Sequence, residues 1–98
     1  MIRSFRDPGT EDIFNGADSK RARRACPSHL WRIARRKLEL VDSAGALADL
    51  RIPSANRLEA LKGNRAGQYS LRVNEQYRIC FVWTSLGPAT VEIVDYHR

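Results

Sequence analysis

The residues best suited to chemistry lie at the end of the chain, where a carboxylate, a phenol and an imidazole follow one another as Asp95, Tyr96 and His97. Two cations, Lys62 and Arg78, come earlier in the sequence. Such a set suits cleavage of an RNA phosphodiester, because a base can activate the ribose 2′-OH while cations stabilise the charge on the phosphate. An acid must then protonate the departing 5′ oxygen, and histidine titrates in the range required.

Each of these residues also has a plainer interpretation. His97 is then a solvated residue near the chain end, and Tyr96 is a half-buried aromatic with its hydroxyl in water. Asp95 caps a strand or pairs with Arg78 for purely structural reasons. Lys62 precedes a glycine turn, where lysine is common as a solvated edge residue. From residue types alone, RNA cleavage and these structural interpretations both stay open.

Four apolar runs after residue 53 would position these side chains: "RLEALKG", "GQYSLRV", "QYRICFVW" and "ATVEIVDY". Turn residues separate them, and links this short predict an antiparallel meander. Apolar and polar residues alternate clearly in the two middle runs, so one face of the sheet should be buried and the other open. The third and fourth runs should pair, which would bring Arg78 close to the end that carries Asp95.

The first half of the chain predicts helices. "MIRSF" favours a short edge strand, and a short helix should follow, with Thr10 as its N-cap and Asn15-Gly16 at its end. Residues 17–29 are polar and basic and are either a loop or a weak helix. A firmer helix follows from an apolar stripe at helical spacing, formed by Leu30, Ile33, Ala34, Leu38 and Val41. The predicted fold is therefore α+β, with a short strand and two helices packed on a four-stranded meander.

The chain has 98 residues, which is enough for a single domain over residues 1–98, and a formal net charge of +6. The first twelve residues lack the apolar centre of a secretory signal, and no apolar run has the length of a membrane span, so we expect a cytoplasmic protein without membrane contact. The positive charge is uneven. One segment holds eight basic residues and no acid: Lys20, Arg21, Arg23, Arg24, Arg32, Arg35, Arg36 and Lys37.

A basic segment of this kind attracts polyanions, but it does not choose between RNA, DNA and an acidic protein. A solvated helix face with no specific ligand is the alternative.

The two cysteines, Cys26 and Cys80, are far apart and lack metal-binding spacing. We therefore expect two small thiols, buried or half-buried, and neither a metal site nor another cofactor.

Three segments together carry a resemblance to a known family: "IRSF" near the start, "NRLEALKGNRAGQYSLRVNEQYRICFVW" in the middle and "VEIVDYH" at the end. They resemble the HigB toxins of the RelE/ParE superfamily over essentially the whole chain. The resemblance implies a RelE-like fold and a bacterial toxin that enters the A site of the 70S ribosome and cuts the bound mRNA. The cut would use the ribose 2′-OH, without a metal, and leave a 2′,3′-cyclic phosphate.

The resemblance also implies a partner, a HigA-type antitoxin with a helix-turn-helix domain. This antitoxin would neutralise the toxin and repress their shared operon with it, so that operator DNA is reached only through the antitoxin. By matching position, Lys62 and Arg78 correspond to the cations that stabilise the reacting phosphate. Asp95, Tyr96 and His97 correspond to the C-terminal catalytic group, with Asp95 or His97 in proton transfer and Tyr96 orienting the substrate.

Glu59 departs from this pattern, because some relatives carry a histidine there. Its carboxylate is either a base or a structural partner of Arg57 or Lys62.

Two other functions stay open, a ParE-like inhibitor of DNA gyrase and a non-catalytic RNA-binding module. The presence of Lys62, Arg78 and the C-terminal group argues against the gyrase inhibitor. The basic segment from Lys20 to Lys37 would contact ribosomal RNA through its phosphates, or the antitoxin would cover it.

Overall fold

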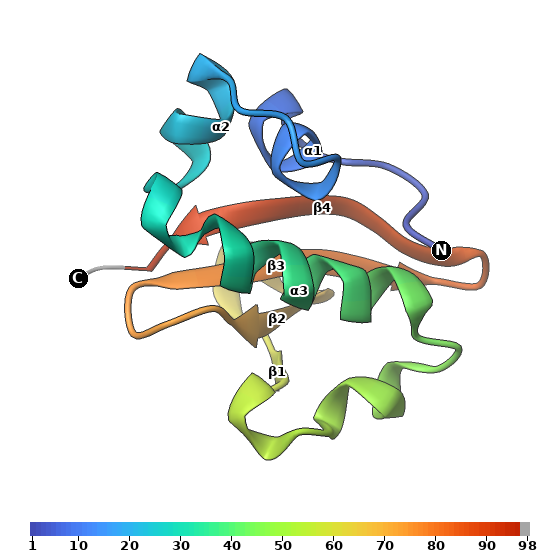
Figure 1. Cartoon of the computed structure of the whole chain (residues 1–98). Helices are drawn as coiled ribbons and strands as arrows, with labels where there is room; N and C mark the ends of the chain where they lie inside the picture. Colours follow the sequence, from blue (N-terminus) through green and yellow to red (C-terminus); the bar gives the residue numbers. More distant parts are fainter. Residues whose placement is uncertain (97–98) are drawn as a thin grey trace.

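The computed structural model describes residues 1–96 and has two layers, three α-helices against one face of a four-stranded antiparallel sheet (Figure 1). The predicted α+β class is confirmed. No helix in the described part of the chain is long and apolar enough to cross a membrane.

The sheet is a meander whose strands lie side by side in chain order. Its strands are β1 (Glu59–Ala60), β2 (Gln68–Arg72), β3 (Tyr77–Thr84) and β4 (Gly87–Asp95). The alternation in the middle strands places Leu71, Ile79 and Phe81 in the core at 0 % exposure, as the sequence predicts. β1 is much shorter than its apolar run, with only two paired residues.

Three helices form the other layer: α1 (Pro8–Phe14), α2 (Lys20–Ala25) and α3 (Trp31–Ser43). α1 begins earlier than predicted because Asp7, and not Thr10, is its N-cap, and the Asp7 carboxylate accepts from the Thr10 backbone N–H at 2.9 Å. The buried Thr10 hydroxyl instead accepts from the backbone N–H of Ile93 at 3.0 Å. This bond joins α1 to β4.

Within residues 17–29, for which the sequence allows either a loop or a weak helix, the structure has a helix, α2. Its N-cap is Ser19, whose side chain accepts from the backbone N–H of Ala22. Ala22 is fully buried, and so small a residue leaves little apolar periodicity for a sequence pattern to detect. In α3 the predicted stripe is buried at Ala34, Leu38 and Val41, whereas Ile33 is 44 % exposed.

The predicted N-terminal strand is wrong. Residues 1–6 run along β4, but only one parallel bridge forms, between Phe5 and Val91. The pairing is interrupted because Thr90 has a left-handed backbone (φ 49°) at an irregularity of β4 and donates its N–H to the side chain of Ser4. Backbone bonds are found on both sides of the irregularity, from the Arg3 N–H to the Pro88 carbonyl at 2.7 Å and from the Arg6 N–H to the Val91 carbonyl at 2.9 Å, but they do not form a regular ladder.

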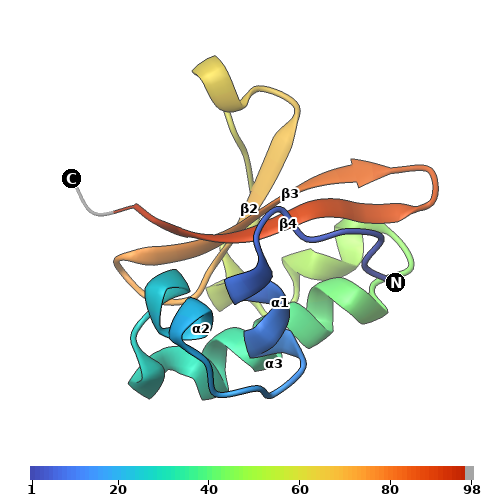
Figure 2. The same ribbon diagram turned by 90° about the horizontal axis from the view of Figure 1, so that it is seen from above.

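One face of the sheet packs on the helices and the other is turned away from them, and we call this second surface the open face. Figure 2 shows α1, α2 and α3 on one side, with the short helical turn η4 (Gly63–Arg65), the gold segment, projecting on the other. The polar residues of the middle strands, including Ser70, Arg72 and Arg78, lie on the open face because they alternate with the core residues.

Candidate functional site

Arg78 is the best-anchored cation of the open face. From β3 its Nε donates to the Ser70 hydroxyl at 2.7 Å, and its Nη2 donates to the Arg57 carbonyl at 2.6 Å. The same Nη2 lies 3.2 Å from the Glu59 carboxylate, and the Arg78 side chain is only 12 % exposed. Several acceptors on a planar guanidinium fix both its position and its orientation. The structure therefore holds a preoriented positive charge at the middle of this face.

Glu59, Lys62 and Tyr96 meet beside it. All three line one cavity of about 410 Å³ at the edge of β1. Tyr96 is held there because its backbone N–H donates to the Gln76 carbonyl at 2.6 Å, just beyond β4. Since Glu59 also pairs with Arg78, four of the residues singled out in the sequence come together on the open face.

The Tyr96 phenol stays protonated at neutral pH. Burial raises its pKa, and the neighbouring Cys80 thiol acts in the same direction, while the positive charges of Arg65 and Arg78 oppose the rise. The thiol of Cys80 is fully buried, and burial raises its pKa too. Tyr96 is thus a neutral hydrogen-bond donor placed where two guanidinium charges act on it.

Arg65 is a further cation of this site that the sequence analysis did not identify. Its Nη1 donates to the Glu92 carboxylate at 3.1 Å and to the Gln68 side chain at 3.0 Å. Partial burial lowers its pKa, but the bond to Glu92 and the surrounding negative groups outweigh this, and the net shift is upward. Arg65 lies in the turn that follows Lys62, and no pattern in the sequence marks its contact with Glu92, 27 residues away.

Asp95 lies on the other face of the sheet. It is opposite Tyr77 in the β3–β4 register, whereas Arg78 is opposite Val94. Its carboxylate accepts from the Gln76 side chain at 3.2 Å and lines a separate cavity, of about 620 Å³, between β4 and the helices α1 and α2. The side chains of Asp95 and Tyr96 therefore line different cavities, and His97 lies outside the described residues.

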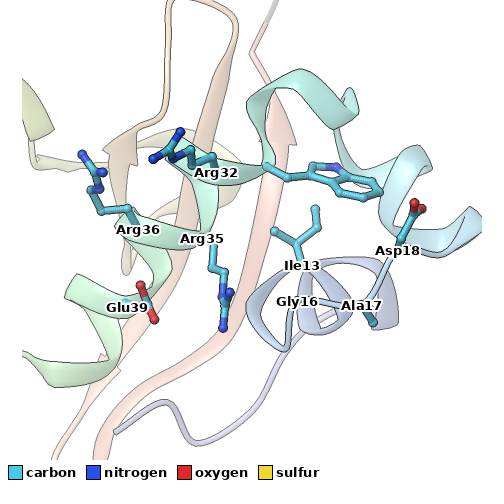
Figure 3. Close-up of a pocket in the computed structure, with 9 residues that line it drawn as sticks. Ile13, Gly16, Ala17, Asp18, Arg32, Arg35, Arg36 and Glu39 are labelled. Atoms are coloured by element: carbon cyan, nitrogen blue, oxygen red, sulfur yellow. The ribbon is translucent and has the colours of Figure 1, made fainter.

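The basic segment belongs to the helical layer. Lys20, Arg21, Arg23 and Arg24 are on α2, and Arg32, Arg35, Arg36 and Lys37 are on α3, so the sheet separates their backbones from the open face. Figure 3 shows the arginines of α3 leaving the helix in different directions around a cavity of about 530 Å³.

Several of these cations are already engaged within the molecule. Arg21 pairs with Asp12 at 2.9 Å, and Arg35 donates to the Phe14 carbonyl at 3.2 Å.

Within residues 1–96, no three histidine, cysteine, aspartate or glutamate side chains are grouped so as to hold a metal ion. Both cysteines are buried as free thiols.

Comparison with known proteins places the chain in a family. Residues 3–97 match the family described as the RelE-like toxin of type II toxin-antitoxin system HigB. Toxin HigB-1 of Vibrio cholerae is 43 % identical over 98 residues, which cover 100 % of this chain and 99 % of the relative. An uncharacterized protein of Haemophilus influenzae is 42 % identical over 55 residues, 56 % of this chain and 54 % of that protein. The chain belongs to the HigB-like toxins of type II toxin–antitoxin systems.

Proposed function

We propose that this toxin is a ribosome-dependent endoribonuclease that cuts mRNA in the ribosomal A site. The observation that carries the proposal is the anchored guanidinium of Arg78, which lies beside Glu59 on a face that also gathers Lys62, Arg65 and Tyr96. Oriented cations at a developing phosphate charge are a large source of rate enhancement in phosphoryl transfer. Family membership supports the toxic role.

The reaction would begin when the ribose 2′ oxygen attacks the adjacent phosphorus. We assign the Glu59 carboxylate to accept the 2′-OH proton, because it is the carboxylate of the cavity that Tyr96 and Lys62 line. Arg78, Lys62 and Arg65 would stabilise the added negative charge on the phosphoryl oxygens. The bond from phosphorus to the 5′ oxygen then breaks, leaving a 2′,3′-cyclic phosphate and a 5′-OH.

The departing 5′ oxygen needs a proton, and we assign its supply to the end of the chain. The Tyr96 phenol carries a proton at neutral pH, as phenols ordinarily do, and burial raises its pKa further. His97 follows it in the sequence. Asp95, on the opposite face, is proposed to act from the helical side of β4, by holding the end of the chain in place. No step of this scheme uses a metal ion.

The partners follow from the same proposal. A type II toxin has a cognate antitoxin, and we propose one of the HigA type, with a helix-turn-helix domain, which represses the shared operon together with the toxin. The basic surface of α2 and α3 would contact ribosomal RNA, since the open face is taken up by mRNA. Such phosphate contacts hold position without reading sequence.

Induced expression in a bacterium, with mRNA 5′ ends mapped across the transcriptome, tests the proposal. Wild type should arrest growth and produce new cuts in phase with codons, while Arg78→Ala and His97→Ala should lose both effects. Arg51→Ala, at an exposed residue outside the site, serves as the matched control. Growth arrest with intact mRNA and DNA damage would indicate a gyrase inhibitor, and arrest that survives in His97→Ala would indicate a non-catalytic RNA-binding module.

A further inference from the structure

A second group of cations on the open face includes Arg78 and lines a cleft that does not contain Tyr96. Arg57, Arg72 and Arg78 line one cleft of about 590 Å³, together with Leu58, Glu59 and Glu75. Three guanidinium groups share this cleft with two carboxylates, so its formal charge is +1. The three guanidinium charges repel one another.

The strand register makes the repulsion direct. Arg72 of β2 and Arg78 of β3 are cross-strand partners, and like charges in that relation destabilise a sheet. Glu59 is within 4 Å of Arg78, but no carboxylate among residues 1–96 is that close to the guanidinium of Arg57 or Arg72. Two of the three charges therefore have no ion-pair partner in the described part of the molecule.

The backbone at Arg57 adds a second cost. This residue has a left-handed conformation (φ 46°, ψ 55°) that non-glycine residues seldom adopt. Its carbonyl oxygen accepts from the guanidinium of Arg78 at 2.6 Å. Arg78 therefore fixes the place from which the Arg57 side chain leaves the backbone, and the cleft is held in shape from within.

The cleft continues on both sides. Glu59 is shared with the cavity that contains Lys62 and Tyr96. Arg57 and Arg72 are shared with a further cleft of about 340 Å³, which reaches Lys37 of α3, whose ammonium group donates to the Asn56 side chain. Three adjoining hollows, each with at least one cation, thus run from the end of β4 to the side of α3.

We propose that the cleft between Arg57, Arg72 and Arg78 binds a phosphodiester adjacent to the one that is cut, so that single-stranded RNA crosses the open face from Tyr96 towards α3. This inference rests on the proposed nuclease function. A phosphate has the charge and the oxygen geometry that pair with guanidinium groups two bonds at a time. A bound phosphate would also relieve the repulsion between Arg72 and Arg78.

A cleft of this kind would act in RNA binding and not in the chemical step, so binding and cleavage are measured separately. Arg57→Gln and Arg72→Gln are compared with wild type and with the control Arg51→Gln, which removes one exposed arginine outside these clefts. Affinity is measured for ribosomes programmed with an mRNA whose A-site codon carries 2′-deoxy sugars and cannot be cut. Cleavage rate is measured with the all-ribose mRNA, and thermal unfolding checks that each variant folds.

Each of the two variants should bind about five- to tenfold more weakly, because one charge-assisted contact is lost. The slope of log affinity against log salt should fall by about 0.7, the value for one phosphate contact on a single strand. The single-turnover cleavage rate at saturation should stay within about twofold of wild type.

Two results overturn the inference: affinities and salt slopes equal to those of Arg51→Gln, or a lower saturated rate with unchanged affinity, which would assign these arginines to the chemical step. Failure of the nuclease proposal looks different, because wild type would then leave the all-ribose mRNA intact. Binding to the uncuttable mRNA would still decide whether the cleft holds a phosphate.

Discussion

Replacing Arg78 with lysine keeps the positive charge and removes the planar guanidinium that organises the open face. The Ser70 hydroxyl accepts from Arg78 at 2.7 Å and is fully buried, so losing this donor should cost about 1–3 kcal/mol of unfolding free energy. Glu59 is 61 % exposed, and water can replace its lost partner at little cost. The expected destabilisation is thus moderate, and the protein should remain folded.

The effect on cleavage should be much larger. A lysine ammonium cannot bond Ser70, the Arg57 carbonyl and a phosphate in fixed directions at once. Misplacing a preoriented donor in this way should lower the single-turnover cleavage rate by roughly 10²–10³-fold. Urea unfolding gives the stability, and cleavage of mRNA on programmed ribosomes gives the rate. If Arg78→Lys cut within threefold of wild type, the role given to the anchored guanidinium would be wrong.

Three further variants test a phenol, a thiol and the helical surface. Tyr96→Phe should slow cleavage by roughly 10–100-fold without a change of affinity; an equal rate would exclude a proton or hydrogen bond from the phenol. Burial raises the pKa of the Cys26 thiol from 9.0 to about 11. The unfolded thiol therefore ionises first, and folding stability should fall as pH rises from 9 to 11, by about 2–3 kcal/mol. Urea unfolding at pH 7.5 and 11 should show a smaller fall for Cys26→Ala, and an identical fall would contradict this cause. Arg24→Glu should weaken ribosome binding by about tenfold or less and leave the cleavage rate of bound mRNA unchanged; a lost rate would argue against separate surfaces.

The sequence was most informative where one periodicity extended over a whole element. Alternation in β2 and β3 identified the buried side chains Leu71, Ile79 and Phe81, and helical spacing identified Leu38 and Val41. It was least informative where tertiary contacts determine the local structure. α2 buries a single alanine side chain, so it has little pattern of its own, and the N-terminal segment pairs with β4 across an irregularity that no local signal announces.

The candidate site likewise contains residues that the sequence identified and residues that it did not. Residue types indicated Lys62, Arg78 and Tyr96, and the structure brings them to one face together with Glu59. The position of Asp95 depends on strand register, because neighbouring residues of a strand point to opposite faces. Arg65 sits in a turn and reaches the site through its contact with Glu92, which is 27 residues away in the sequence. Sequence spacing does not predict a contact of that kind.

We propose above all that the open face cuts mRNA through the ribose 2′-OH. The most direct measurement identifies the new RNA ends after purified toxin acts on ribosomes programmed with a defined mRNA. We expect one cut in the A-site codon, with a 2′,3′-cyclic phosphate on one fragment and a 5′-OH on the other, and strong loss of the cut in Arg78→Lys. Fragments with a 3′-OH and a 5′-phosphate, or intact mRNA on ribosomes that have bound the toxin, would contradict it.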